Sequence, residues 1–175
     1  MRKLMLLAGV LPLMLLVLPS QARAQKFTAY GGYSFFHLQS TPQAANLNGW
    51  DGSLTYDFLS PLGVTADFSG NYGSINNIGG SAIHTYLFGP ELRFPAAYSP
   101  YVHLMFGGVR VSGGGSSPMS SVVHTTFSTT FGGGLDLRMS KQFAIRAFQI
   151  DYVTSHFNHQ RQDNFRMSAG IVFRF

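Results

Sequence analysis

The last twelve residues, from Asn164 to Phe175, constrain the fold of this chain more than any other segment. Apolar and polar side chains alternate along them, and Val172 is the one exception. The apolar positions are Phe165, Met167, Ala169, Ile171, Phe173 and Phe175, and the polar ones are Asn164, Arg166, Ser168, Gly170 and Arg174. A period of two residues over this length predicts a β-strand with one apolar and one polar face.

The first 24 residues have the pattern of a secretory signal peptide. Arg2 and Lys3 precede a long apolar run, and the segment ends on the small-x-small sequence Ala22-Arg23-Ala24. A retained membrane anchor is the alternative, but Pro12 and Pro19 interrupt the apolar run. We therefore expect cleavage after residue 24 and a single domain over residues 25–175.

Composition narrows the classes of function. Cleavage removes three of twelve basic residues and leaves nine against seven acidic ones, so the net charge falls from +5 to +2. The basic character thus resides largely in the signal peptide, and it does not indicate a nucleic-acid partner. The chain has no cysteine, which excludes disulfides and thiolate metal sites.

Alternation alone does not say which face of the strands points outward. A soluble barrel needs a charged exterior, commonly rich in lysine and glutamate. After residue 24 the lysines are Lys26 and Lys141 and the one glutamate is Glu91, whereas aromatic residues make up 14% of the chain. This shortage of charge favours a barrel with its apolar face in lipid and its polar face inside.

The chain divides into eight strand-like segments, at about residues 26–38, 48–58, 64–72, 83–94, 101–111, 122–137, 143–155 and 164–175. Their connections are alternately short, near residues 60, 96 and 140, and longer, near 43, 77, 116 and 159. This predicts an eight-stranded antiparallel up-and-down barrel with longer loops of about ten residues at one end. We expect β-bulges at Pro90 and near Phe148. The second follows because Arg146 is at an even position and Asp151 at an odd one (opposite parities), so a regular strand could not turn both side chains inward.

Four segments resemble those of OmpA/OmpX-type outer membrane β-barrel domains: YGGYSF (30–35), LFGPELRF (87–94), GGGLDLR (132–138) and NFRMSAGIVFRF (164–175). The resemblance implies a bacterial outer-membrane protein with lipid and lipopolysaccharide as partners. The alternation of short and longer connections predicts that both termini lie in the periplasm. The resemblance also implies insertion by the barrel-assembly machinery through the last strand. The residues expected to form that C-terminal signal are Phe165, Met167, Ile171, Phe173 and Phe175.

An eight-stranded barrel is narrow, and its interior is filled by side chains. Six acids and five arginines occupy the positions of the polar face of their strands and are therefore expected to point inward. They are Asp51, Asp57, Asp67, Glu91, Asp136, Asp151, Arg93, Arg138, Arg146, Arg166 and Arg174. We expect a salt-bridged plug in place of an apolar core. Seven aromatic residues are instead assigned to the interfacial girdles: Tyr30, Trp50, Tyr56, Tyr72, Tyr86, Phe94 and Tyr101.

These observations favour a monomeric barrel with a structural or surface-interaction role, without cofactor, metal or enzymatic activity. A narrow channel for ions or small solutes is the first alternative, because the same inward charges could line a path. A lipid A-modifying enzyme is the second. His124, Ser128 and Asp136 share one face of a strand, but they are too far apart for one catalytic triad. The six histidines are scattered, and the pair His156 and His159 is better explained as solvated than as a metal site.

Overall fold

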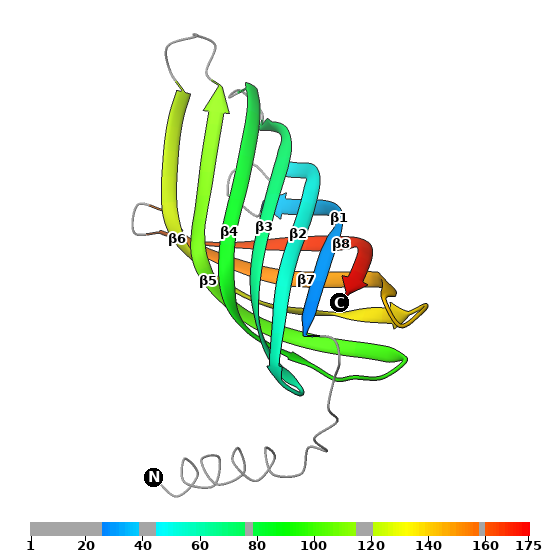
Figure 1. Ribbon diagram of the computed structural model, residues 1–175. Coiled ribbons are helices and arrows are strands. Elements are labelled where there is room, and N and C mark those ends of the chain that lie inside the picture. Colours follow the sequence, from blue (N-terminus) through cyan, green and yellow to red (C-terminus); the bar gives the residue numbers. More distant parts are fainter. Residues whose placement is uncertain (1–25, 39–44, 76–78, 115–120, 158–159) are drawn as a thin grey trace, which may run out of the picture.

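The computed structural model describes residues 26–38, 45–75, 79–114, 121–157 and 160–175, and within these ranges the chain is built from eight strands. They are β1 (Phe27–Leu38), β2 (Ala45–Leu59), β3 (Leu62–Ile75), β4 (Gly79–Arg93), β5 (Tyr98–Gly114), β6 (Ser121–Arg138), β7 (Phe143–Phe157) and β8 (Gln160–Arg174). Each strand pairs antiparallel with the next, and β8 pairs with β1 (Figure 1). The predicted closed up-and-down barrel is therefore confirmed. No helix in the described part is long and apolar enough to cross a membrane.

Side chains alternate between the two faces of the barrel wall in the predicted sense. On β2, Trp50, Leu54 and Phe58 are exposed on the outer surface. Asp51 and Thr55, on the opposite parity, are each only 1% exposed. The same division holds on β3, where Phe68 lies outside and Asp67 inside. The barrel has an apolar exterior and a polar interior, as a lipid-embedded barrel requires.

The C-terminal strand closes the barrel against the first strand. The two strands pair from Thr28 with Arg174 to Leu38 with Asn164. The backbone amides of Phe27 and Phe175 each donate to the other residue's carbonyl at 2.9 Å, and their rings stack at 5.7 Å. Val172, the exception to the alternation, is buried inside with Tyr30 and Ala144.

Of the two predicted bulges, one is present and one is not. The register of β7 shifts against β6 and β8 between Arg146 and Gln149, and this shift turns both Arg146 and Asp151 inward. At Pro90 the expectation was wrong, because the pairing of β4 with β5 is interrupted opposite Gly89 and Pro90 without a change of register. A side chain at Gly89 would overlap the Leu104 carbonyl, so the two backbones approach closely there and no extra residue is needed.

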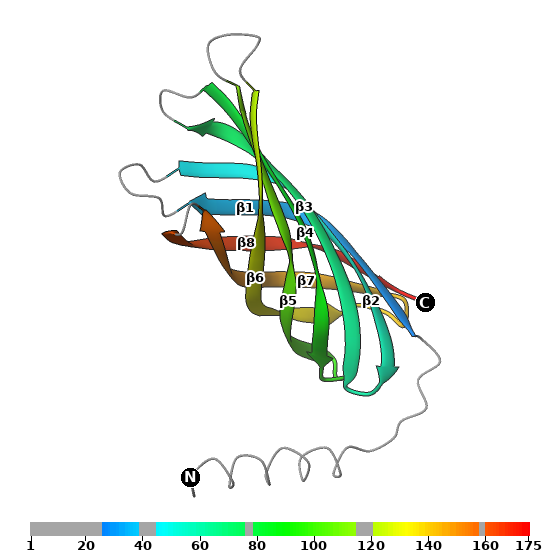
Figure 2. The ribbon, with the colours of Figure 1, turned by 90° about the vertical axis from the view of Figure 1, so that its left-hand side faces the viewer.

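The two ends of the barrel differ. Both termini of the described barrel and the short connections at residues 60–61, 94–97 and 139–142 lie at one end, the short-turn end (Figure 2). The other end carries residues 39–44, 76–78, 115–120 and 158–159, which lie outside the described residues, and we call it the loop end. Strands continue further toward the loop end than expected, so β8 begins at Gln160 rather than Asn164. The predicted ten-residue loops are therefore too long, because polar residues beyond the apolar alternation still pair as extended hairpins.

Candidate functional site

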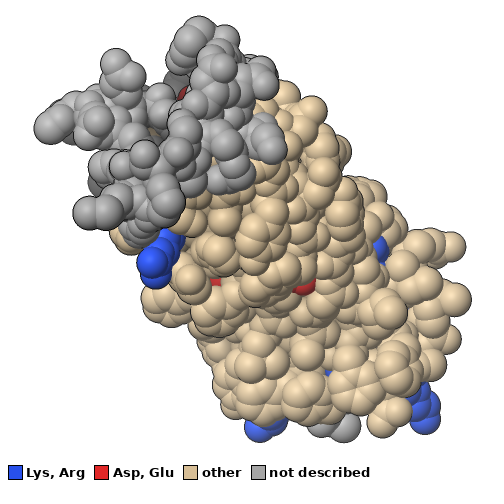
Figure 3. All heavy atoms as spheres, turned by 90° about the horizontal axis from the view of Figure 1, so that it is seen from above, with Lys and Arg blue, Asp and Glu red and all other residues tan. Residues whose placement is uncertain are grey.

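The charged side chains gather inside the barrel, whereas its surface carries few charges (Figure 3). Nine of the eleven residues predicted to face inward are buried: Asp51, Asp67, Glu91, Arg93, Asp136, Arg146, Asp151, Arg166 and Arg174. The other two differ from the expectation. Arg138 is exposed because it is the last residue of β6, beyond the wall that covers Asp136. Asp57 is half-buried, at a point near the end of β2 where the register with β3 shifts.

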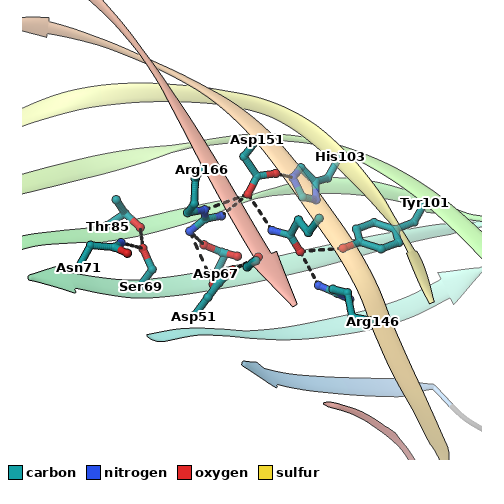
Figure 4. Close-up of polar contacts among 12 residues, drawn as sticks. Asp51, Asp67, Ser69, Asn71, Thr85, Tyr101, His103, Arg146, Asp151 and Arg166 are labelled. Carbon is teal, nitrogen blue, oxygen red and sulfur yellow. Dashed lines mark hydrogen bonds and ion pairs between the residues drawn. The ribbon is translucent and has the colours of Figure 1, made fainter. Parts of the chain in front are cut away.

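Arg166 on β8 is the centre of the first charged group (Figure 4). Its guanidinium lies 2.8 Å from Asp67 Oδ1, 2.7 Å from Asp151 Oδ2 and 3.6 Å from Asp51 Oδ1. These carboxylates come from β3, β7 and β2. One arginine therefore joins strands from opposite sides of the barrel, and we call these four residues with His103 the Arg166 cluster.

Gln149, next to His103 of the Arg166 cluster, extends the cluster toward the short-turn end. His103 Nε2 lies 2.7 Å from Asp151 Oδ1, and both residues are buried. The Gln149 amide nitrogen donates to Asp151 Oδ2 at 2.7 Å, while its oxygen accepts from Tyr101 at 2.7 Å and from Arg146. Because Gln149 contacts an acid at one end and a base at the other, it connects two charged groups into one network.

The second group, the Asp136 cluster, collects three arginines around one carboxylate. Asp136 accepts from Arg146 Nε at 2.9 Å, pairs with Arg93, and lies 3.5 Å from Arg174 Nη2. Glu91 accepts from Arg93 Nε at 2.9 Å and from its Nη2 at 2.6 Å. Charged hydrogen bonds of this kind are the strong ones, and the planar guanidinium suits them.

Two tyrosines predicted for the interfacial girdle are part of this interior instead. Tyr30 is 5% exposed and Tyr101 is 2% exposed. The guanidinium carbon of Arg146 lies 4.0 Å from the ring centre of Tyr30 and 4.4 Å from that of Tyr101. Arg146 is thus held by both rings through cation–π contacts, which are strongest where water is excluded. The other five predicted girdle aromatics, Trp50, Tyr56, Tyr72, Tyr86 and Phe94, are exposed on the outside.

Glycines on β6 make room for this network. A Cβ atom at Gly132 would lie 2.8 Å from His103 Nε2, and one at Gly134 would lie 2.7 Å from the Tyr101 hydroxyl oxygen. Neither distance is compatible with a real side chain. The nearest groups to these two positions come from β7, namely Asp151 Oδ1 at Gly132 and the Phe148 carbonyl at Gly134. Side chains of β5 and groups of β7 therefore both occupy the space that the glycines leave.

The loop end of the interior contains an apolar group that the sequence did not lead us to predict, beside buried uncharged polar residues such as Ser81, Ser155 and Asn164. A group of buried residues lies there and is called the apolar cluster: Phe36, Leu38, Ala45, Leu47, Ile83, Val109 and Val153. Phe36 and Leu47 are 1% and 0% exposed, and Phe36 pairs directly with Arg166 of the first charged group. The signal was present, since Ile83 has the parity of the inward Thr85, and Val153 that of Asp151. The interior therefore changes toward the loops from charged side chains to a mixture of apolar and uncharged polar ones.

Two of the three residues considered for a catalytic triad have other partners. Ser128 Oγ donates to the Thr154 carbonyl at 3.0 Å, and Asp136 is occupied by arginines, so these two do not form a triad. The side chain of His124, like those of His156 and His159, lies outside the description. Among the described residues, no three histidine or acidic side chains are grouped as metal ligands. The charged groups of the interior that the structure describes pair with one another.

The predicted C-terminal signal residues lie on the outer face of β8 and just beyond it. Phe165, Met167, Ile171, Phe173 and Phe175 are all exposed there, between 36% and 64%. They form an apolar row that faces the position of the bilayer.

This architecture was compared with those of known proteins. No curated protein sequence matches the chain significantly. Among solved structures, Neisserial surface protein A aligns with a TM-score of 0.73 at 13% identity, over 85% of this chain and 97% of that one. Ail, the attachment invasion locus protein of Yersinia pestis, aligns at 0.62 and 20% identity, over 87% and 100%. The N-terminal β-barrel domain of Pseudomonas aeruginosa OprF aligns at 0.62 and 13% identity, over 87% and 100%.

At these identities the structural likenesses show the fold alone. The family is shown by the sequence itself, because the model of the outer membrane protein beta-barrel domain matches residues 8–175. The chain belongs to this family of bacterial outer-membrane barrels.

Proposed function

We propose that this protein is a sealed outer-membrane scaffold that presents its loops for contacts at the cell surface. One observation carries the proposal: side chains fill the interior in two different ways along its length. The Asp136 and Arg166 clusters cross-link the strands in the short-turn half, and the apolar cluster fills the loop end. A lumen filled in this manner supports a structural role over a path for ions or solutes.

The proposal includes an orientation. Short connections of outer-membrane barrels are periplasmic, and their longer connections are extracellular. Residues 60–61, 94–97 and 139–142 share one end with both termini, and this end would face the periplasm. Residues 39–44, 76–78, 115–120 and 158–159 would then be at the cell surface. We further propose a monomer in contact with lipid and lipopolysaccharide, inserted by the barrel-assembly machinery through its last strand.

A surface-interaction role has indirect support from fold. One protein with a similar barrel, Ail, is named for attachment and invasion. That name describes Ail alone, and it is the reason for choosing attachment as the role to test here. The same reasoning makes the loops, rather than the interior, the part to test.

The test compares bacteria that express the intact protein with bacteria that express a loop variant. In the variant, residues 115–120 between β5 and β6 are replaced by a Gly-Ser linker of the same length, so the strands are untouched. We expect the intact protein to raise adhesion to host cells or matrix-coated surfaces and the variant to lose that increase. Equal amounts of folded protein in the outer membrane, measured by electrophoresis with and without heating, are the control.

Other results would contradict the proposal. Unchanged adhesion on expression of the intact protein would remove the surface-interaction role. Faster uptake of small solutes by the same cells would favour the channel. A change in lipid A acylation, measured by mass spectrometry with and without expression, would favour the enzyme.

A further inference from the structure

Among the described side chains, Arg110 is an arginine on the outer face of the barrel that the interior network does not explain. Arg110 on β5 is exposed, on the same parity as the outward residues Val102, Leu104 and Phe106. The pairing of β5 with both neighbours continues through this position without a register shift, so the strand does not slip to turn Arg110 inward. A cation on a lipid-facing surface costs about 2–4 kcal/mol at the bilayer midplane and little near its interfaces.

The position of Arg110 along the wall matches the interface at the loop end. On β4 the outward apolar residues run from Tyr86 to Leu92, followed by Phe94, a length close to the roughly 9–11 residues with which a tilted strand crosses the hydrocarbon. The next outward residue of β4 toward the loops is His84, and His84 pairs with Arg110. Arg110 therefore lies just beyond one crossing.

Polar contacts also occur on the outer surface of other strands, toward the loop end. On the outer surface of β1 and β2, Tyr33 donates to Asn48, and His37 Nδ1 lies 2.7 Å from Asn46 Oδ1. On β3 and β4, the Tyr72 hydroxyl lies 3.2 Å from His84 Nε2. Such pairs are typical of headgroup depth, where an aromatic ring meets water and polar lipid.

Arg110 has no acidic neighbour on the strands around it. The acidic residues of β4, β5 and β6 are Glu91 and Asp136, both buried inside toward the short-turn end. Residues 76–78 and 115–120, which connect β3 to β4 and β5 to β6, contain no acid in the sequence. An anion must therefore come from outside the chain if the guanidinium is to be paired.

The residues beside Arg110 suit a phosphate. Side chains opposite each other on paired strands have Cβ atoms about 5 Å apart, so His84 and Arg110 can reach one anion together. Since Tyr72 contacts Nε2 of His84, the Nδ1 atom remains on the opposite edge of the ring for a second partner. Thr125, which pairs with Arg110 from β6, is exposed on the same face and adds a hydroxyl group.

A notch for a hydrocarbon chain lies directly below this row. Gly108 is outward-facing and pairs with Tyr86 on one side and Phe127 on the other, two rings that are 48% and 61% exposed. Those rings stand on strands about 10 Å apart. A Cβ at Gly108 would meet nothing nearer than 3.8 Å, whereas Gly70 is covered by the rings of Trp50 and Tyr72. The wall therefore has a gap at Gly108 that its own side chains leave open.

We propose that Arg110, His84 and Thr125 bind a phosphate of lipid A in the outer leaflet, with one acyl chain in the notch at Gly108. This site rests on the orientation in the proposed function, since it requires the loop end to lie in the lipopolysaccharide leaflet. The positive charge of Arg110 favours a lipid that carries phosphate. The outer leaflet, in which the site would lie, contains lipid A as its phosphorylated lipid.

The test is native mass spectrometry of the folded barrel in detergent with added lipids. We expect diphosphorylated lipid A to bind in preference to dephosphorylated lipid A and to phosphatidylglycerol. Arg110→Ala should weaken this binding about fivefold, the effect of one basic residue at an anionic lipid surface. Gly108→Leu, which fills the notch without touching the charge, should weaken it as well. Arg138→Ala is the matched control, because Arg138 is exposed at the short-turn end, and it should leave binding unchanged.

Three results would overturn the site. They are equal binding of dephosphorylated lipid A, equal binding of phosphatidylglycerol, and an equal loss in Arg110→Ala and Arg138→Ala. A separate measurement checks the orientation. Cysteine in place of Ser117 should react with a membrane-impermeant maleimide on intact cells. Loss of lipid selectivity with normal labelling contradicts the site alone, whereas absent labelling contradicts the orientation on which both proposals rest.

Discussion

The two halves of the barrel interior are filled by opposite means. The short-turn half is an ionic network of four buried arginines and five buried acids. The loop end holds the apolar cluster around Phe36 and Leu47, together with buried uncharged polar residues such as Ser155. In the ionic half each residue depends on named partners, so loss of one leaves a buried charge unpaired. In the apolar half a lost side chain leaves a cavity into which neighbours can partly relax. One narrow lumen can therefore be filled by two kinds of packing, and the stability lost on substitution of one side chain differs between them.

The largest expected effect tests the ionic half. Arg166→Ala removes the cation shared by Asp51, Asp67 and Asp151, and we expect a loss of about 3–5 kcal/mol in the free energy of unfolding. Urea titration in lipid vesicles measures it, with the fluorescence of the single tryptophan, Trp50, as the probe.

Arg138→Ala is the control for that experiment. Arg138 is exposed, so its removal should change stability by no more than about 0.5 kcal/mol. A similar small change for Arg166→Ala would show that the ionic network does not hold the strands together.

A smaller effect is expected in the apolar half. Leu47→Ala should destabilise the barrel by about 2–3 kcal/mol, through lost contacts and the cavity left behind. The matched substitution is Leu54→Ala on the same strand, where the side chain faces outward and is 47% exposed. It should cost less than about 1 kcal/mol in vesicles, because only a lipid contact is lost. Equal costs at the two positions would mean that the apolar cluster contributes no packing of its own.

The smallest effect separates charge from geometry within the Asp136 cluster. Arg146→Lys keeps the charge but loses the planar group held between Tyr30 and Tyr101, and we expect a loss of about 1–2 kcal/mol. Tyr101→Phe keeps the ring and removes only the hydrogen bond to Gln149, at about 1 kcal/mol. If lysine were tolerated without cost, the cluster would need only a positive charge at this position.

Much of the fold was readable from the sequence because a strand in a bilayer has one simple requirement, an apolar side and a polar side. Alternation located all eight strands, and the parity conflict between Arg146 and Asp151 located the β7 bulge. Strand ends were less accurate, since polar hairpin residues such as those around Gln160 pair outside the alternating region.

The interior was only partly predictable, for a physical reason. The odd or even position of a residue along its strand predicts the face on which its side chain lies, but not the residues that the side chain contacts. Tyr30 and Tyr101 were assigned to lipid because aromatic rings are common there. Their inward position depends on Arg146 between them and on the space left by Gly134 across the sheet. That complementarity joins β1, β5, β6 and β7 and is not visible in any one segment.

Single-channel recording in a planar lipid bilayer tests the central claim most directly. The purified mature barrel should show no conductance steps, because both halves of its interior are filled. Leu47→Ala and Arg166→Ala should also remain silent, since each substitution opens one half and leaves the other closed. Reproducible steps from the unaltered protein would contradict the account.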